Sequence, residues 1–213
     1  MKKNQAGLHI STLTLLVAAL IVSACGKSTT EPAAQTAAAT QATAPVASWQ
    51  EFRDQFLEAH FKAHPGFAVS AGRHEYDGQL PDWSAAGIAA EVKRLHTARA
   101  AAVGFGDTAL SQSERFERDY LVARMDRELF WLEIAEAPFR NPAFYFDWIS
   151  DSLDPSPYLT REYAPLEQRM RAYIGYLRSI PRVAPQVKAN LRTPLALPLL
   201  ERGVSGFRGF ADF

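Results

Sequence analysis

The chain has 213 residues, with 23 basic and 23 acidic side chains, so its formal net charge at neutral pH is zero. This balance, without basic clusters, gives no reason to expect a nucleic-acid partner. A single cysteine excludes an internal disulfide, so the hydrophobic core must hold the fold.

The first 25 residues have the pattern of an exported bacterial lipoprotein. Two lysines precede an uncharged, mostly apolar run over residues 10–22, and small residues follow up to the lone Cys25. A basic start, a short apolar run and small residues before the cleavage point define a secretory signal. Small residues directly before a cysteine resemble the lipoprotein form of that signal, which implies cleavage between Ala24 and Cys25 and attachment of diacylglycerol and a further acyl chain such as palmitate. We therefore predict a signal peptide over residues 1–24 and lipidation of Cys25.

Two alternatives for this segment stay open. One is a transmembrane anchor, although residues 10–22 fall short of the roughly 20 apolar residues that a membrane-spanning helix needs. The other is a secretory protein with a free cysteine. Because two or three acyl chains anchor a protein stably, we expect the lipid bilayer to be a partner through acylated Cys25. Gly26, next to the cysteine, is not aspartate. By resemblance to the sorting of enteric lipoproteins, this favours export to the outer membrane, so we expect a place in the cell envelope, at the outer membrane facing the periplasm.

Residues 25–47 are predicted to be the lipidated cysteine followed by a disordered tether. Alanine, threonine, glutamine and proline dominate this segment, and no large apolar residue occurs before Val46. Such a sequence cannot bury enough surface to offset its ordering entropy. Pro32 and Pro45 also oppose a continuous helix. The alternative to a disordered tether is a helix favoured by the many alanines.

Residues 48–213 predict an all-α domain, an irregular multi-helix bundle. Ser48 and Ser111, each with a glutamate three residues later, are capping boxes that begin helices. The first helix should end near residues 64–66, and a turn should follow at residues 76–78. A second helix should follow Ser84 and end at the glycines of residues 104–106. Pro138 should close the third helix.

The second half of this region predicts three more helical segments. A short amphipathic helix dense in aromatic residues should follow residues 141–142 and end at residues 154–157. A long helix is predicted over about residues 163–179, and Pro181 and Pro185 should lie in a connector or in the first turn of the next helix. The apolar spacing of residues 194–213 predicts a final helix.

The sequence contains no complete catalytic or metal-binding motif. The spacing of His60 and His64 matches that of H-E-x-x-H, in which two histidines bind zinc and the glutamate acts on water, but Phe61 replaces the glutamate. Two histidines on the polar side of a helix end are the simpler interpretation. Ser205 lies in a helical pattern and not in G-x-S-x-G. Carboxylate pairs such as residues 114/117 and 151/154 are typical of solvated faces, so we assign no catalytic residue, no metal ligand and no cofactor.

Two interpretations of the aromatic segment around residues 139–148 remain open. It could line a ligand groove, or it could pack between helices, and packing is the interpretation we favour.

The order of short motifs along residues 48–213 resembles a bacterial envelope family catalogued as domain of unknown function 885. The matching segments are FAVSAG at residues 67–72, HEYDG at 74–78, LPDWS at 80–84, the aspartate-bearing helix around Asp119, Asn141-Pro142, Ile180-Pro181 and GFRGF at 206–210. Members commonly carry a lipoprotein or secretory signal. They are much longer, and their later half carries a histidine-glutamate helix motif that is similar to that of zinc metallopeptidases.

This resemblance implies the N-terminal helical part of a zinc metallopeptidase-like protein, without the catalytic half. We therefore expect the chain to be inactive as a peptidase by itself, and expect zinc only in the missing C-terminal half. Partners would be that missing half, or a second copy through an exposed stripe of Leu199, Phe207 and Phe210 on the last helix. The alternative is a complete, non-catalytic helical binding or scaffolding lipoprotein that uses residues 144–148 as its contact surface.

Overall fold

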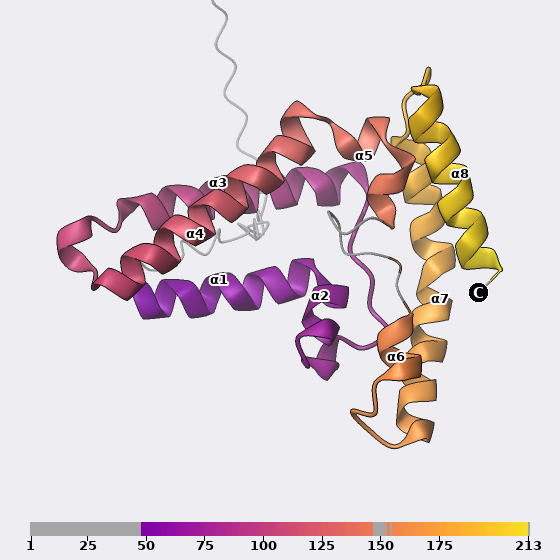
Figure 1. The fold of residues 1–213 in the computed structure, drawn as a ribbon, viewed down its shortest axis with the longest axis horizontal. Helices are drawn as coiled ribbons and strands as arrows, with labels where there is room; N and C mark the ends of the chain where they lie inside the picture. Colours follow the sequence, from indigo (N-terminus) through magenta and orange to yellow (C-terminus); the bar gives the residue numbers. More distant parts are fainter. Residues whose placement is uncertain (1–47, 147–152, 154, 213) are drawn as a thin grey trace, which may run out of the picture. The chain divides into compact units, whose positions relative to one another are not determined.

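The computed structural model describes residues 48–146, 153 and 155–212 (Figure 1). All regular structure in this part of the chain is helical, so the all-α prediction is confirmed. The predicted signal peptide, cleavage site, Cys25 and tether lie outside the described residues, as does most of the predicted helix that ends at residues 154–157. None of the described helices combines the length and the hydropathy that a membrane span requires.

Three long helices make the first part of the fold: α1 (Trp49–Ala63), α3 (Ala85–Gly104) and α4 (Gln112–Leu129). The helices α3 and α4 lie side by side and are joined through the short η2 (Asp107–Ala109), as Figure 1 shows. Trp49 of α1 reaches α4, because its indole Nε1 donates to Glu117 Oε2 at 3.0 Å. The predicted starts are confirmed, since the Ser48 and Ser84 hydroxyls accept amide protons of the first turns and Ser111 forms a full capping box.

The connection between α1 and α3 covers residues 64–84 and contains two short helical segments and the turn that was predicted at residues 76–78. Helix α1 ends at Ala63, but Pro65 opens α2 (Pro65–Ser70) at once, because proline fits the first turn of a helix. The turn η1 (His74–Tyr76) follows. Gly78 has φ +76, and an added Cβ would lie 3.2 Å from Tyr176 N of the later helix α7. Glycine therefore permits both the turn and the close approach of the two backbones.

The end of α4 differs from the prediction that Pro138 closes this helix. The helix continues as a π-helical turn, η3 (Phe130–Ile134), and then stops at Glu136, whose φ is +47. Pro138 instead lies in the first turn of a new short helix, α5 (Ala137–Arg140). A backbone N–H in the first turn has no intrahelical acceptor, so proline removes no hydrogen bond there. The 3₁₀ turn η4 (Pro142–Tyr145) follows, capped by the side chain of Asn141, so the predicted restart at residues 141–142 is confirmed.

The long helix of the second half is also longer than predicted. After α6 (Ser156–Thr160), α7 (Leu166–Asn190) runs through Pro181 and Pro185, which were predicted to interrupt it. Both prolines are exposed, so water can solvate the carbonyl groups that they leave without an intrahelical donor. The opposite face is buried at Val183, Val187 and Asn190, one helical turn apart, and this packing holds the helix together.

The last helix, α8 (Leu197–Ala211), packs on η4. Phe207 meets Phe146 edge to face at 5.2 Å, and buried Gly203 lies against Pro142. The predicted exposed stripe is therefore partly wrong: Leu199 and Phe207 are half-buried, and the side chain of Phe210 lies outside the described part. A different set of α8 side chains is exposed, namely Leu197, Leu200 and Val204.

The core joins both halves of the described chain. Its main cluster is aromatic and aliphatic, and contains Trp49, Phe52, Phe56, Trp83, Ile88, Leu95, Met125, Leu129, Phe144, Tyr145, Val183 and Val187 among others. One polar group ties this cluster together: Asn190 Nδ2 donates to Trp83 O at 2.6 Å and to Tyr145 Oη at 3.0 Å. Buried polar groups need such partners, so this contact fixes α7 against the segment that enters α3.

Candidate functional site: a charged cluster beside a cavity

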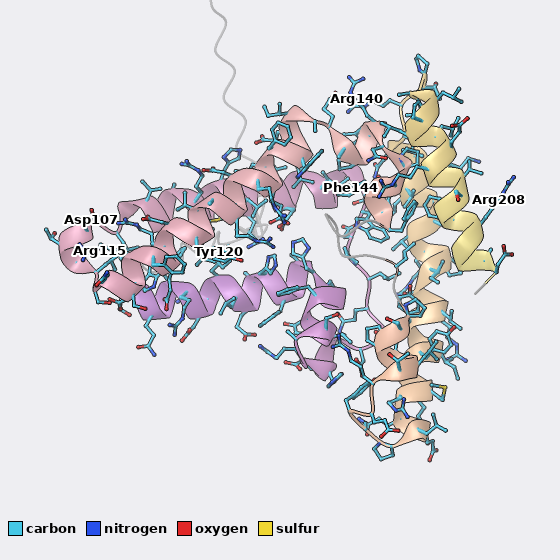
Figure 2. The ribbon with its side chains drawn as sticks, in the orientation of Figure 1. Asp107, Arg115, Tyr120, Arg140, Phe144 and Arg208 are labelled. Atoms are coloured by element: carbon cyan, nitrogen blue, oxygen red, sulfur yellow. The ribbon has the colours of Figure 1, made fainter. Side chains whose placement is uncertain are left out.

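A cavity of about 550 Å³ lies where the end of α1, the segment before α3, the first half of α3 and the end of α4 come together. This volume is in the range of small-molecule sites. One wall is apolar and is formed by Trp83, Ile88, Trp131, Leu132 and Phe144. Phe144, labelled in Figure 2, lies in η4 and is otherwise buried in the core, so the prediction that this aromatic segment packs between helices is confirmed for it. The same side chain also borders the cavity.

The other wall carries charge and comes from three segments. His64 lies between α1 and α2, Glu91 and Arg94 share one face of α3, and Glu128 lies on α4. All four side chains are only 16–20% exposed. Placing Glu91 and Arg94 three residues apart on α3 puts them on one face of the helix.

The guanidinium of Arg94 holds Glu91 as an ion. Arg94 Nε donates to Glu91 Oε2 at 2.7 Å and Nη2 donates to Oε1 at 2.6 Å. Burial alone would raise the pKa of Glu91, but the hydrogen bonds from Arg94 and His64 outweigh it and lower the pKa to about 2. Arg94 also lies 5.4 Å from the ring centre of Phe56, within cation–π range. Its remaining nitrogen, Nη1, is buried without a hydrogen-bond partner among the described residues.

The second carboxylate, Glu128, has a different environment. Burial raises its pKa, and the nearby Glu91 charge acts in the same direction, while His64, Arg94 and Arg124 oppose the shift. His64 Nε2 lies 3.3 Å from Glu128 Oε1 and 3.1 Å from Glu91 Oε1, so His64 forms an ion pair with both carboxylates when it is protonated. One imidazole nitrogen therefore faces two carboxylates, and Glu91 of the two is also bound by Arg94.

His60, in the last turn of α1, completes the cluster. Its ring centre lies 4.3 Å from that of His64, and burial together with repulsion from His64 and Arg94 lowers its pKa to about 3. His60 is therefore neutral at physiological pH. Ligand-capable atoms of His60, His64 and Glu128 all lie within 4.8 Å of one another.

The structure places the other sequence candidates away from this cluster. Glu114 belongs to the Ser111 capping box and Glu117 binds Trp49, so this pair is structural. His74 Nδ1 lies 3.2 Å from Asp77 Oδ1, and its ring stacks on that of Tyr163. Exposed Ser205 lies within α8, as its helical pattern indicated. The pair at residues 151/154 lies outside the described part of the chain.

Sequence reasoning found the two histidines but missed their partners. The interpretation of His60 and His64 as the polar side of a helix end did not anticipate that they meet Glu91, Arg94 and Glu128. The available signal was weak: Glu91 and Arg94 are charged positions beside the apolar stripe of Ile88 and Leu95. Nothing in the local sequence marks Glu128 among the many charged residues of α4.

Comparison with known proteins places the fold in a family. Residues 65–212 match the family described as "Bacterial protein of unknown function (DUF885)". The chain belongs to the DUF885 family. This confirms the resemblance that the order of its motifs predicted, while the relationship of the family to zinc metallopeptidases remains a prediction.

A solved structure has the same fold as this DUF885 protein. It is described as "a putative lipoprotein of unknown function from Shewanella oneidensis" and matches with a TM-score of 0.66 at 19% sequence identity, over 76% of this chain and 29% of its own. The chain thus spans less than a third of that relative. No curated protein matches the chain.

Proposed function

We propose that this chain is the N-terminal helical part of a lipid-anchored, zinc metallopeptidase-like envelope protein, and that it supplies a substrate-binding wall but no catalytic zinc. The zinc-binding catalytic motif would lie in the longer part of the family that these 213 residues do not contain. Two observations support this division: the sequence has no H-E-x-x-H, and it spans 29% of its solved relative.

The cavity is the observation that carries the proposal. It presents aromatic and aliphatic side chains on one wall, including Trp83 and Trp131, and charged groups on the other. Arg94 retains a buried N–H donor that can donate to a carbonyl or carboxylate oxygen, and Glu128 can pair with a cationic or amide group. Peptides combine these features, so we infer a peptide-like ligand.

A contact surface for the rest of the protein is available on α8. Leu197, Leu200 and Val204 are 64%, 40% and 40% exposed, and their spacing puts them on one face of the helix. An exposed apolar face of this kind is typical of a surface that contacts protein. We infer that the missing half covers it, with self-association as the alternative in its absence.

Peptide hydrolysis tests the proposal that this chain binds substrate but does not itself catalyse hydrolysis. The full chain, purified in detergent, is incubated with fluorescence-quenched peptides with and without a zinc chelator, beside a longer family member that carries the histidine-glutamate motif. We expect chelator-sensitive turnover from the longer protein and none from this chain. Chelator-sensitive turnover by this chain would overturn the proposal of a non-catalytic part.

Metabolic labelling tests the anchor. Cells expressing the chain are fed an alkyne-tagged palmitate, and the wild type is compared with Cys25→Ser. We expect label and membrane association for the wild type and loss of both for the variant. If Cys25→Ser keeps its label, lipid is attached elsewhere; if neither protein is labelled, the lipoprotein interpretation is wrong.

The alternative, a complete scaffolding or binding lipoprotein, rests on the same cavity, since Phe144 both packs in the core and borders it. The DNA that follows the Phe213 codon discriminates between the two. A reading frame that continues, or is shifted, into a histidine-glutamate motif supports the peptidase-like protein. A stop codon followed by an unrelated gene supports the complete lipoprotein.

A further inference from the structure

We propose that His60, His64 and Glu128 bind a divalent transition-metal ion, with zinc as the metal that best suits two imidazoles and one carboxylate. This site is distinct from the catalytic zinc of the proposed longer protein and does not depend on it, because all three ligands lie in the described part of this chain. The sequence assigned no metal to these histidines, since the third ligand comes from a helix more than 60 residues away.

The geometry is close to that of a bound ion. Ligand-capable atoms of His60, His64 and Glu128 lie within 4.8 Å of one another. Zinc bonds of about 2.0–2.2 Å place tetrahedral ligand atoms about 3.4 Å apart. The observed separations exceed this spacing by at most about 1.4 Å, a difference that rotation of the side chains can close.

The charges of the cluster also favour a cation at this point. The two carboxylates and the Arg94 guanidinium leave one net negative charge when the histidines are neutral. Arg94 is committed to Glu91 through two hydrogen bonds, and Glu128 pairs with His64, which carries a positive charge only when it is protonated. The observed separation of 3.3 Å between His64 Nε2 and Glu128 Oε1 is close to the roughly 3.4 Å expected for two tetrahedral zinc ligands.

The ring nitrogen of His60 that could bind a metal makes only a weak contact with its surroundings. The contact of Arg94 Nη2 with His60 Nδ1, at 3.5 Å, is at the outer limit of hydrogen bonding. A metal on His64 Nε2 would replace the 3.1 Å contact of that nitrogen with Glu91 Oε1. Three protein ligands leave a coordination position free, and His64 and Glu128 both border the cavity, from which the ion and a further ligand can reach it.

Metal titration of the full chain in detergent tests this site. Zinc is titrated by calorimetry, and cobalt(II) by its visible absorption. We expect one equivalent of metal per chain, and at least about tenfold weaker binding in both His60→Gln and Glu128→Gln. His96→Gln and His74→Gln are matched controls, because each of these histidines also pairs with one carboxylate, Glu133 and Asp77 respectively. Their affinity should match that of the wild type.

A second measurement, on the unmodified protein, decides the matter if a variant fails to fold. Zinc should protect two histidines, His60 and His64, from diethyl pyrocarbonate, as mapped by mass spectrometry, and leave the modification of His96 unchanged. No binding, binding that the His60 and Glu128 variants retain, or protection of other histidines alone would overturn the proposal. Peptidase activity is not the readout, so failure of the metal site is distinguishable from failure of the proposed function.

Discussion

Replacing Gly203 by alanine should loosen the packing of α8 on η4. A Cβ at Gly203 would lie 2.5 Å from Pro142 Cβ and 3.1 Å from its Cγ, well inside ordinary van der Waals contact. The proline ring is rigid, and the adjoining turn is held by the Asn141 cap on Ala143 N, so the helix rather than the ring must move. Overpacking of this kind costs about 1–3 kcal/mol, and the better helix propensity of alanine returns up to about 1 kcal/mol.

The matched control is Gly209→Ala in the same helix, where no atom lies within 4 Å of the added methyl group. This variant should gain about 0.5 kcal/mol from propensity alone. We therefore expect Gly203→Ala to unfold at lower urea concentration than Gly209→Ala, with a difference in unfolding free energy of about 2 kcal/mol, followed by far-ultraviolet circular dichroism. Equal stabilities within about 0.5 kcal/mol would refute the packing of α8 on η4.

Two further predictions concern buried polar groups. The pKa of His60 falls from its ordinary 6.5 to about 3 on folding, so the unfolded chain binds a proton between these values that the folded chain does not. The stability that His60 contributes is therefore complete above pH 6.5 and is lost as the pH falls. Between pH 7 and 5, the unfolding free energy measured in urea should fall by about 1–2 kcal/mol more for the wild type than for His60→Gln. Equal losses would show that His60 is not buried in its neutral form. Asn190→Ala removes the amide that donates to Trp83 O and Tyr145 Oη, and should cost about 2–3 kcal/mol of unfolding free energy. Gln186→Ala removes the acceptor of the part-buried Trp83 N–H and an exposed hydrogen bond to Asp82, and should cost about 1 kcal/mol. Similar costs for the two variants would contradict the role given to Asn190.

Much of the fold follows from local sequence signals. Several features depend on one or two residues and their immediate neighbours, and each of them was predicted correctly. They are the serine caps before α1, α3 and α4, the end of α1 before Pro65, and the turn at Gly78. Local signals failed where distant packing decides the outcome. Pro181 and Pro185 do not end α7, because the face opposite them is buried against the core.

The site could be predicted only in part for the same reason. The spacing of His60 and His64 is a local feature, but the meaning of that spacing depends on which side chains face it across α3 and α4. Glu91 and Glu128 are 37 residues apart in the sequence and meet at the same imidazole. A pattern within one helix cannot reveal that juxtaposition.

Our central claim is that His60, His64 and Glu128, the half-buried cluster beside the cavity, bind a metal ion. Crystals of the protein grown with zinc, measured on both sides of the zinc absorption edge, test it most directly. We predict an anomalous difference peak about 2.0–2.2 Å from donor atoms of His60, His64 and Glu128. Zinc found only elsewhere, for example between His74 and Asp77, or an ordered cluster with no peak at all, would contradict the claim.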